Sequence, residues 1–97
     1  MEKFETQQAD PAVWLRDHGD HLYEYAMFRL NDRHIAEDMV QETLLAGWKA
    51  YDKFQGHSSI KTWLTTILHN KIVDFVRKAA REKLVFRGED LDYELPG

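Results

Sequence analysis

The sequence contains no cysteine and only two prolines among its 97 residues. Without cysteine, the chain can form neither disulfides nor thiolate-ligated zinc sites. No uninterrupted apolar segment approaches the roughly 20 residues that span a bilayer, and the opening MEKFETQQADP lacks the basic-then-apolar order of a signal peptide. We therefore expect a cytoplasmic protein that does not insert into a membrane.

Features of enzyme active sites are equally scarce. Gly56 and Gly88 stand alone, so no glycine-rich loop is available to cradle a phosphate. His18 and His21 lie three residues apart, and a small metal-dependent enzyme built on them is one alternative, which would require bound metal in the purified protein. Because no second ligand cluster completes that site, we expect exposed histidines, no cofactor, no metal and no catalytic activity.

Charge is divided unevenly along the chain, although its net value is −4. Residues 1–60 hold six basic and eleven acidic side chains, residues 61–87 hold seven basic and two acidic ones, and residues 88–97 hold four acidic ones. This asymmetry predicts separate surfaces for separate partners, with a solvated basic helix end as the simpler alternative.

Helical periodicity extends over most of the chain, and no strand-like alternation or internal repeat is present. We expect an all-α domain of three main helices over residues 10–83, preceded by a flexible N-terminus over residues 1–9. Residues 84–97 are interpreted as an acidic linker or a truncated tail. Asp10 and Pro11 are typical of a helix start, and Gly19 predicts a kink or a short break in this first helix.

The second helix, expected from about Arg33 to Tyr51, has two distinct sides. Its predicted buried side carries Gly47, and a glycine there indicates close approach of another helix. Its predicted outward side carries four residues of mixed acidic, amide and apolar character, namely Asp38, Gln41, Glu42 and Leu45.

The third helix, expected from about Ile60 to Lys83, follows the loop QGHSS, in which Ser58 or Ser59 can supply the cap. We expect its apolar side to pack against the second helix. The predicted core consists of Ala36, Val40, Leu44, Trp48, Trp63, Leu64, Ile67 and Phe75.

The polar side of the third helix has the chemistry of nucleic-acid recognition. Asn, Arg and Thr side chains read base edges, Lys and Arg bind phosphates, and aromatic rings stack on unpaired bases. An inert polar helix face is the alternative. The candidate nucleic-acid contacts are Phe54, His57, Ser58, Lys61, Thr62, Thr66, Asn70, Lys71, Arg77 and Lys78.

Residues 36–81, AEDMVQETLLAGWKAYDKFQGHSSIKTWLTTILHNKIVDFVRKAAR, resemble region 2 of bacterial sigma-70 family sigma factors, especially the extracytoplasmic-function (ECF) group. The similarity lies in AED-hydrophobic-VQET, W-x-A-Y-D-x-F, the Gly/Ser loop, TWL and the Asn-bearing basic helix, and HLYEYAMFRLND also resembles the family's first core helix. It covers roughly residues 12–83. The resemblance implies a helical domain that binds core RNA polymerase and both recognises and helps to melt the promoter −10 element.

The resemblance also assigns roles to residues. Asp38, Gln41, Glu42 and Leu45 would dock on the clamp helices of the polymerase β′ subunit. The loop from Phe54 to Ser59 would receive a flipped −10 base, and Asn70 would read the non-template strand. Position 66 is Thr instead of the family's usual basic residue, which predicts weaker phosphate contact there.

Further partners follow from the same resemblance. An anti-sigma factor is expected, and ECF factors carry a second domain that reads the −35 element, which is not found up to Gly97. The alternative is a helical interaction module that binds a regulatory protein without contacting DNA.

Overall fold

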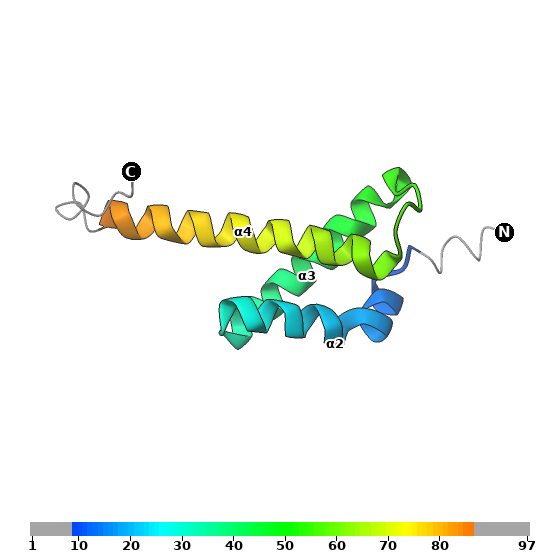
Figure 1. The fold of residues 1–97 in the computed structure, drawn as a ribbon, viewed down its shortest axis with the longest axis horizontal. Coiled ribbons are helices and arrows are strands. Elements are labelled where there is room, and N and C mark those ends of the chain that lie inside the picture. Colours follow the sequence, from blue (N-terminus) through cyan, green and yellow to red (C-terminus); the bar gives the residue numbers. More distant parts are fainter. Residues whose placement is uncertain (1–8, 87–97) are drawn as a thin grey trace.

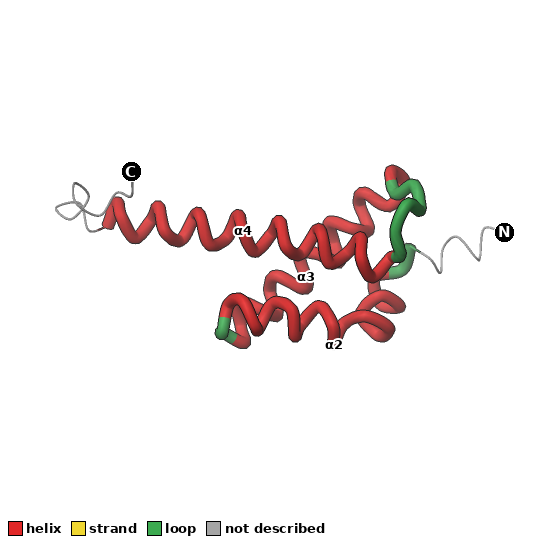
Figure 2. Tube along the Cα trace, viewed as in Figure 1, coloured by secondary structure: helices red, strands yellow, loops and turns green. Residues whose placement is uncertain are grey.

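The computed structural model describes residues 9–86, with side chains from residue 9 to residue 83. The described chain contains helix α2 (Pro11–Leu30), helix α3 (Arg33–Ala50), the short 3-10 helix η1 (Tyr51–Lys53) and helix α4 (Ile60–Phe86). Figure 2 shows that short loops connect them. The all-α fold with three main helices is therefore confirmed.

The three helices all contact one another. Helices α2 and α4 run in the same direction, while α3 crosses behind them in the opposite sense (Figure 1). Helix α4 continues well past the end of α2 (Figure 1). This arrangement leaves one side of α3 and one side of α4 free of helix contacts.

Side-chain caps set the starts of α2 and α3, and a left-handed residue sets the end of α2. The carboxylate of Asp10 accepts a hydrogen bond from Ala12 N at 2.9 Å, and that of Asp32 accepts one from Ile35 N at 3.0 Å. Asn31 ends α2 in the left-handed conformation with φ 54°, which asparagine tolerates better than most residues. The sharp turn between α2 and α3 was thus predictable from Asn31 and Asp32.

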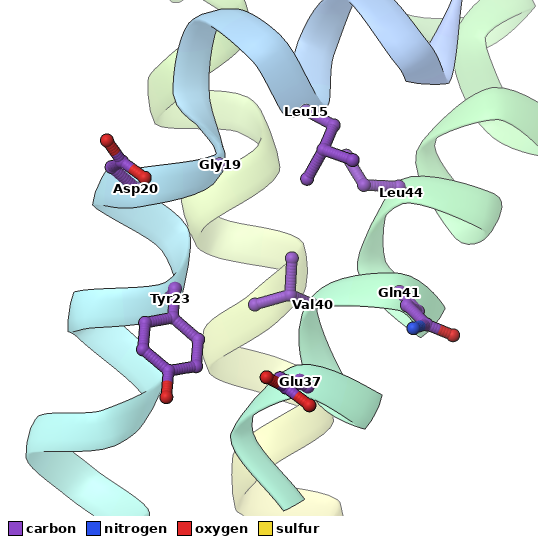
Figure 3. Close-up of a pocket in the computed structure, with 8 residues that line it drawn as sticks. All are labelled: Leu15, Gly19, Asp20, Tyr23, Glu37, Val40, Gln41 and Leu44. Carbon is purple, nitrogen blue, oxygen red and sulfur yellow. The ribbon is translucent and has the colours of Figure 1, made fainter. Parts of the chain in front are cut away.

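Helix α2 is not broken at Gly19. Its hydrogen-bonded helix continues through this buried residue to Leu30, while the ribbon changes direction near Gly19 (Figure 3). Of the two predicted alternatives, a kink or a short break, the short break is therefore wrong. Continuous backbone hydrogen bonding and burial against the other helices outweigh the roughly 1 kcal/mol that glycine costs in a helix.

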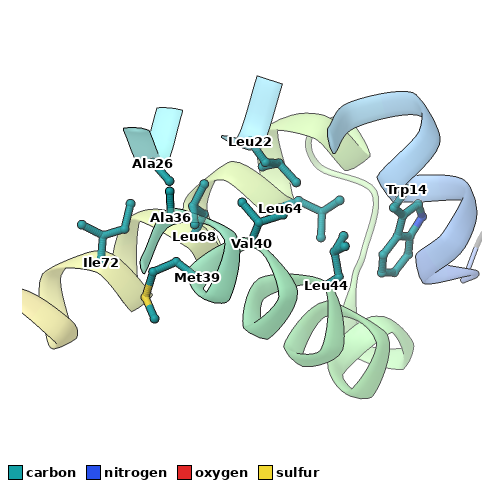
Figure 4. Close-up of a cluster of buried hydrophobic side chains, with 10 residues drawn as sticks. All are labelled: Trp14, Leu22, Ala26, Ala36, Met39, Val40, Leu44, Leu64, Leu68 and Ile72. Atoms are coloured by element: carbon teal, nitrogen blue, oxygen red, sulfur yellow. The ribbon is translucent and has the colours of Figure 1, made fainter. Parts of the chain in front are cut away.

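The core lies where the three helices meet (Figure 4). Its buried apolar residues are Trp14, Leu22, Ala26, Ala36, Met39, Val40, Leu44, Leu64, Leu68 and Ile72. The expected core residues Trp63, Ile67 and Phe75 are half-buried and pack against this cluster. They form its edge instead of its centre.

Trp48 is the clear error in the predicted core, because 54% of this residue is exposed. The neighbouring Gly47 is the residue that is buried where the helices meet. Since consecutive residues are about 100° apart around a helix, Trp48 is turned toward the outside of α3.

The contact at Gly47 confirms the predicted close approach. A Cβ atom at this position would lie 2.8 Å from Leu64 Cδ2 and 3.3 Å from a ring carbon of Trp14. Both neighbours are buried core residues, so neither can move away freely. Glycine at residue 47 therefore determines how closely α2 and α4 approach α3.

We predict different effects for alanine at the two helical glycines. Gly47→Ala should lower the free energy of unfolding by about 1–3 kcal/mol through overpacking. Gly19→Ala should leave it unchanged or raise it by up to about 1 kcal/mol, because the added Cβ meets only the outer end of the exposed Leu15 side chain at 2.9 Å. Urea denaturation measures both, and equal effects would show that residue 47 is not a tight contact.

Candidate functional site

The outward side of α3 is exposed as predicted. Asp38, Gln41 and Glu42 are open to solvent, and Leu45 is 53% exposed. Trp48 follows Leu45 after three residues and is exposed to the same extent. Two large apolar side chains thus lie next to an acidic patch, which is the composition of a protein-binding surface with an apolar centre.

A shallow apolar groove extends from these two residues toward the start of α2. It has a volume of about 350 Å³ and is lined by Ala9, Asp10, Pro11, Leu45 and Trp48. The groove depends on the outward position of Trp48, which the sequence analysis placed in the core. The sequence did contain one indication of an apolar outward surface, namely Leu45, an apolar residue three positions before Trp48 on the side predicted to be exposed.

A second hollow lies between α2 and α3 and has a volume of about 360 Å³ (Figure 3). Val40 and Leu44 form its apolar floor, and Gln41 lines it from the outward side of α3. Carboxylates from both helices, Asp20 and Glu37, lie at its edges (Figure 3). This hollow suits a long side chain with an apolar stem and a basic end.

The loop between η1 and α4 is held by a cluster of aromatic rings. The centroid of the Phe54 ring lies 4.7 Å from that of the Trp63 ring and 5.9 Å from that of the Tyr51 ring. Trp63 in turn meets the buried Trp14 edge to face, with centroids 6.1 Å apart. These contacts connect the loop directly to the core, so its first residues have a defined position.

A small open pocket of about 220 Å³ lies inside this loop. It is lined by Lys53, Phe54, Gln55, His57, Ser58 and Trp63. His57 and Ser58 are exposed, whereas Phe54 and Trp63 are half-buried. Aromatic walls beside polar groups can hold a flat heterocycle by stacking and hydrogen bonding. Phe54, His57 and Ser58 were predicted to lie together here, and Gln55 belongs to the predicted loop from Phe54 to Ser59, whereas the contributions of Lys53 and Trp63 were not predicted.

Ser59, and not Ser58, caps α4. Its hydroxyl oxygen accepts a hydrogen bond from Thr62 N at 3.1 Å and donates to Thr62 Oγ1 at 3.1 Å. Ser59 therefore fixes the first turn of α4 against the loop pocket.

The predicted reading face of α4 is exposed along its length. Thr62, Thr66, Asn70 and Arg77 are all open to solvent, and helical spacing places them on one side. The hydroxyl of Thr66 donates to Thr62 O at 3.1 Å, so it can only accept hydrogen bonds from a ligand. Among the residues that the structure describes, none forms a hydrogen bond with the Asn70 amide, which is therefore free to donate and accept.

The predicted lysine contacts do not form one group. Lys61 and Lys78 are exposed, whereas Lys71 is half-buried. Lys71 and Lys78 are seven residues apart and share a side of α4 that lies well away from Asn70. They place positive charge on one flank of the predicted reading face without belonging to it.

Two hydrogen bonds between α2 and α4 were not predicted. His21 Nε2 lies 3.1 Å from Thr65 Oγ1, and Tyr25 Oη lies 2.9 Å from His69 Nδ1. Because the Thr65 hydroxyl donates to Lys61 O at 2.7 Å, its oxygen accepts from His21 Nε2–H. The available signal was the matching four-residue spacing of the polar residues on both helices, but sequence alone did not pair them.

His18 and His21, the two residues of the metal alternative, are half-buried instead of exposed as expected. His21 is engaged with Thr65, and Asp17, the acidic residue next to His18 in the chain, is bound to Arg16 at 3.0 Å. The hydrogen bond from Arg16 holds the pKa of Asp17 below its ordinary value. Within residues 9–86, no three His, Asp or Glu side chains lie close enough together to hold a metal ion. None of the helices in this range is long and apolar enough to cross a membrane.

Comparison with known proteins identifies the family. Residues 14–82 match the family model described as Sigma-70 region 2. The chain is 39% identical over 69 residues to a probable RNA polymerase sigma factor of Haemophilus influenzae, an alignment that covers 71% of this chain and 36% of the relative. Over 51 residues it is 49% identical to the ECF RNA polymerase sigma factor SigG of Mycobacterium tuberculosis, covering 53% of this chain and 14% of the relative.

A third relative is the ECF RNA polymerase sigma factor SigM of Bacillus subtilis, 33% identical over 61 residues, with 63% of this chain and 37% of SigM aligned. The chain thus spans well under half the length of these curated relatives. No solved structure matches it significantly.

The two loop serines provide a matched test of the cap. Ser59→Ala should lower the free energy of unfolding by about 0.5–2 kcal/mol, because Thr62 N loses its partner. Ser58→Ala should change it by less than about 0.5 kcal/mol, since Ser58 donates only a 3.3 Å bond to Ser59 O at an exposed position. Thermal or urea unfolding monitored by circular dichroism distinguishes them, and a larger loss at Ser58 would contradict this assignment.

Proposed function

Because the chain belongs to the sigma-70 region 2 family, we propose that it acts as the region 2 domain of an ECF-type sigma factor. In this role it binds core RNA polymerase and recognises and helps to melt the promoter −10 element. The observation that carries the proposal is the aromatic pocket at the start of α4, directly before the exposed Thr62–Asn70 face. The separate acidic and apolar face of α3 supports a second, protein partner.

The polymerase surface proposed for α3 contains Asp38, Gln41, Glu42 and Leu45, and the exposed Trp48 extends it. By resemblance to the family, the partner is the clamp-helix pair of the β′ subunit. Exposed ion pairs contribute little on their own, whereas a large apolar group that loses its water on binding contributes most. Leu45 and Trp48 therefore supply the affinity, and the acidic residues supply orientation and association rate.

The hollow between α2 and α3 extends this surface. Gln41 belongs both to the outward side of α3 and to the lining of the hollow. An arginine or lysine of the polymerase could place its stem on Val40 and Leu44 and its charge near Asp20 and Glu37. Binding at this point would tie α2 as well as α3 to the polymerase.

The DNA surface combines the loop pocket with α4. Opening a promoter exposes base faces and edges that a duplex hides. The pocket beside Phe54, His57 and Trp63 can take one unpaired base by stacking. The exposed amide of Asn70 can then distinguish a second base, because it donates and accepts at once.

Location and regulation follow from the proposed activity. A sigma factor works where RNA polymerase works, so we infer a cytoplasmic protein. We also infer regulation by an anti-sigma factor, which would compete with the polymerase if it covered the apolar pair Leu45 and Trp48.

The polymerase proposal is tested by Leu45→Arg. This change should abolish binding to core polymerase, because it places a charge at the centre of the apolar contact. Val76→Arg is the matched control, since Val76 is 50% exposed on α4, away from the α3 face. Pull-down with core polymerase measures binding, and circular dichroism confirms the fold. If a folded Leu45→Arg protein still binds, α3 does not dock in this way.

The DNA proposal is tested by comparing Asn70→Ala with Lys78→Ala. The probes are a −10 non-template strand, selected from a random-sequence pool by the complex of this chain with core polymerase, and its scrambled version. Asn70→Ala should reduce the preference for the selected strand by about 1–3 kcal/mol. Lys78→Ala should weaken both strands alike and flatten the salt dependence.

Fluorescence anisotropy of labelled strands measures both effects. Equal losses on selected and scrambled strands for Asn70→Ala would reduce Asn70 to a generic contact. An unaltered affinity in every variant would favour the alternative, a domain that binds proteins without touching DNA.

A further inference from the structure

We propose that α2 provides a second base-stacking surface for the same single strand, formed by Phe28 beside Arg29. This inference rests on the proposed function, because it assumes that α4 guides single-stranded DNA. It adds a helix to which the sequence analysis assigned no contact with nucleic acid. The ligand it would take is one nucleotide, with the base on Phe28 and the phosphate on Arg29.

Packing within the protein does not explain why residue 28 is a large aromatic residue. It is 86% exposed, more than any other large apolar residue described. It lies three residues after Tyr25 and seven after His21, and therefore on the side of α2 that faces α4. The proposed polymerase hollow lies on the other side of α2, next to Leu15 and Gly19.

Arg29 places a fixed cation at this ring. Its guanidinium lies 3.5 Å from the centroid of Tyr25 and 5.8 Å from that of Phe28. Arg29 NH1 also donates to Tyr25 O at 3.2 Å. The stacking and the hydrogen bond orient the group, and its remaining N–H donors stay available for a phosphate.

Tyr25 connects this pair to α4. Its hydroxyl is hydrogen-bonded to His69 Nδ1 at 2.9 Å, and the two rings meet edge to face with centroids 6.4 Å apart. His69 is the immediate neighbour of Asn70 in the chain. The Phe28–Arg29 surface is therefore held in a constant position relative to the proposed reading face.

The register between the helices gives the distance along the strand. His21 pairs with Thr65 and Tyr25 pairs with His69, so the offset between α2 and α4 is 44 residues in both cases. The same offset places Phe28 level with residue 72, which is roughly 18 Å along α4 from Ile60 at 1.5 Å per residue. A single DNA strand that places one base in the loop pocket and then runs along Thr62, Thr66 and Asn70 would reach Phe28 a few nucleotides later.

The local charges favour DNA over an apolar protein segment. The α4 residues near this level that are open to solvent include Val76, Arg77 and Lys78, and the acidic Asp74 lies within one turn of both basic residues. Glu24, one turn before Phe28, is an exposed acid on the same part of α2, and the Arg29 guanidinium lies 5.8 Å from the centroid of the Phe28 ring. An exposed aromatic ring paired with arginine is the usual composition of a single-strand stacking site.

The test combines protein variants with altered DNA. Phe28 is changed to Ala, Leu or Trp in the complex with core polymerase. The probe is the selected −10 strand, intact or with one abasic site placed at each position in turn. Leu keeps the apolar volume but lacks an aromatic face, whereas Trp keeps the face.

Phe28→Ala and Phe28→Leu should weaken binding of the intact strand roughly 5- to 150-fold, the range for losing one base–aromatic stack. Phe28→Trp should bind as the native chain does. For the native chain, one abasic position outside the loop pocket should cost a similar factor, and that cost should disappear in Phe28→Ala. Arg29→Gln should lower the salt slope by about 0.7, the value for one single-strand phosphate.

Other outcomes separate the two proposals. If the native complex binds no single strand, the proposed function itself fails. If it binds and every Phe28 variant binds equally well, or Leu replaces Phe without loss, only the stacking surface is overturned. Loss of polymerase binding in a folded Phe28→Ala protein would identify a protein contact and also overturn it.

Discussion

The rest of the structure depends on the close contact between helices at Gly47. Because this residue has no side chain, Leu64 from α4 and Trp14 from α2 both pack against the backbone of α3. The ring of Trp14 then meets that of Trp63 edge to face, and Trp63 in turn packs against Phe54 at the start of the loop. A contact in the centre of the bundle thus sets the position of a pocket at its surface.

The bundle keeps two chemically different surfaces apart. The outward side of α3 is acidic and apolar, and the outward side of α4 is basic and carries the hydroxyls of Thr62 and Thr66 and the amide of Asn70. A net charge of −4 would suggest repulsion of DNA, but the division between helices removes this objection. Charge near a binding surface matters more than the total, because salt screens interactions beyond about 10 Å.

Much of the fold could be predicted because helix periodicity and caps are local. Asp10, Asn31 and Asp32 mark helix ends by their own chemistry, and Gly47 indicates a close contact by its position in an apolar stripe. Trp48 was misplaced because a large aromatic residue next to that stripe could be assigned to either side. The pairing of Tyr25 with His69 could not be predicted, because the register between helices 44 residues apart is set by three-dimensional packing.

Helix α4 has one backbone but two environments. Through Phe75 its inner side is packed against the bundle, whereas every residue from Val76 to Lys83 is exposed. Isolated helical turns are barely stable in water, so amide hydrogens in the outer half should exchange with solvent through local fraying, and those near Leu64 and Leu68 only through global unfolding. A partner could therefore straighten, bend or unwind the outer half at little energetic cost, which would move Arg77 relative to Thr62, Thr66 and Asn70 while the helices of the bundle stay in place.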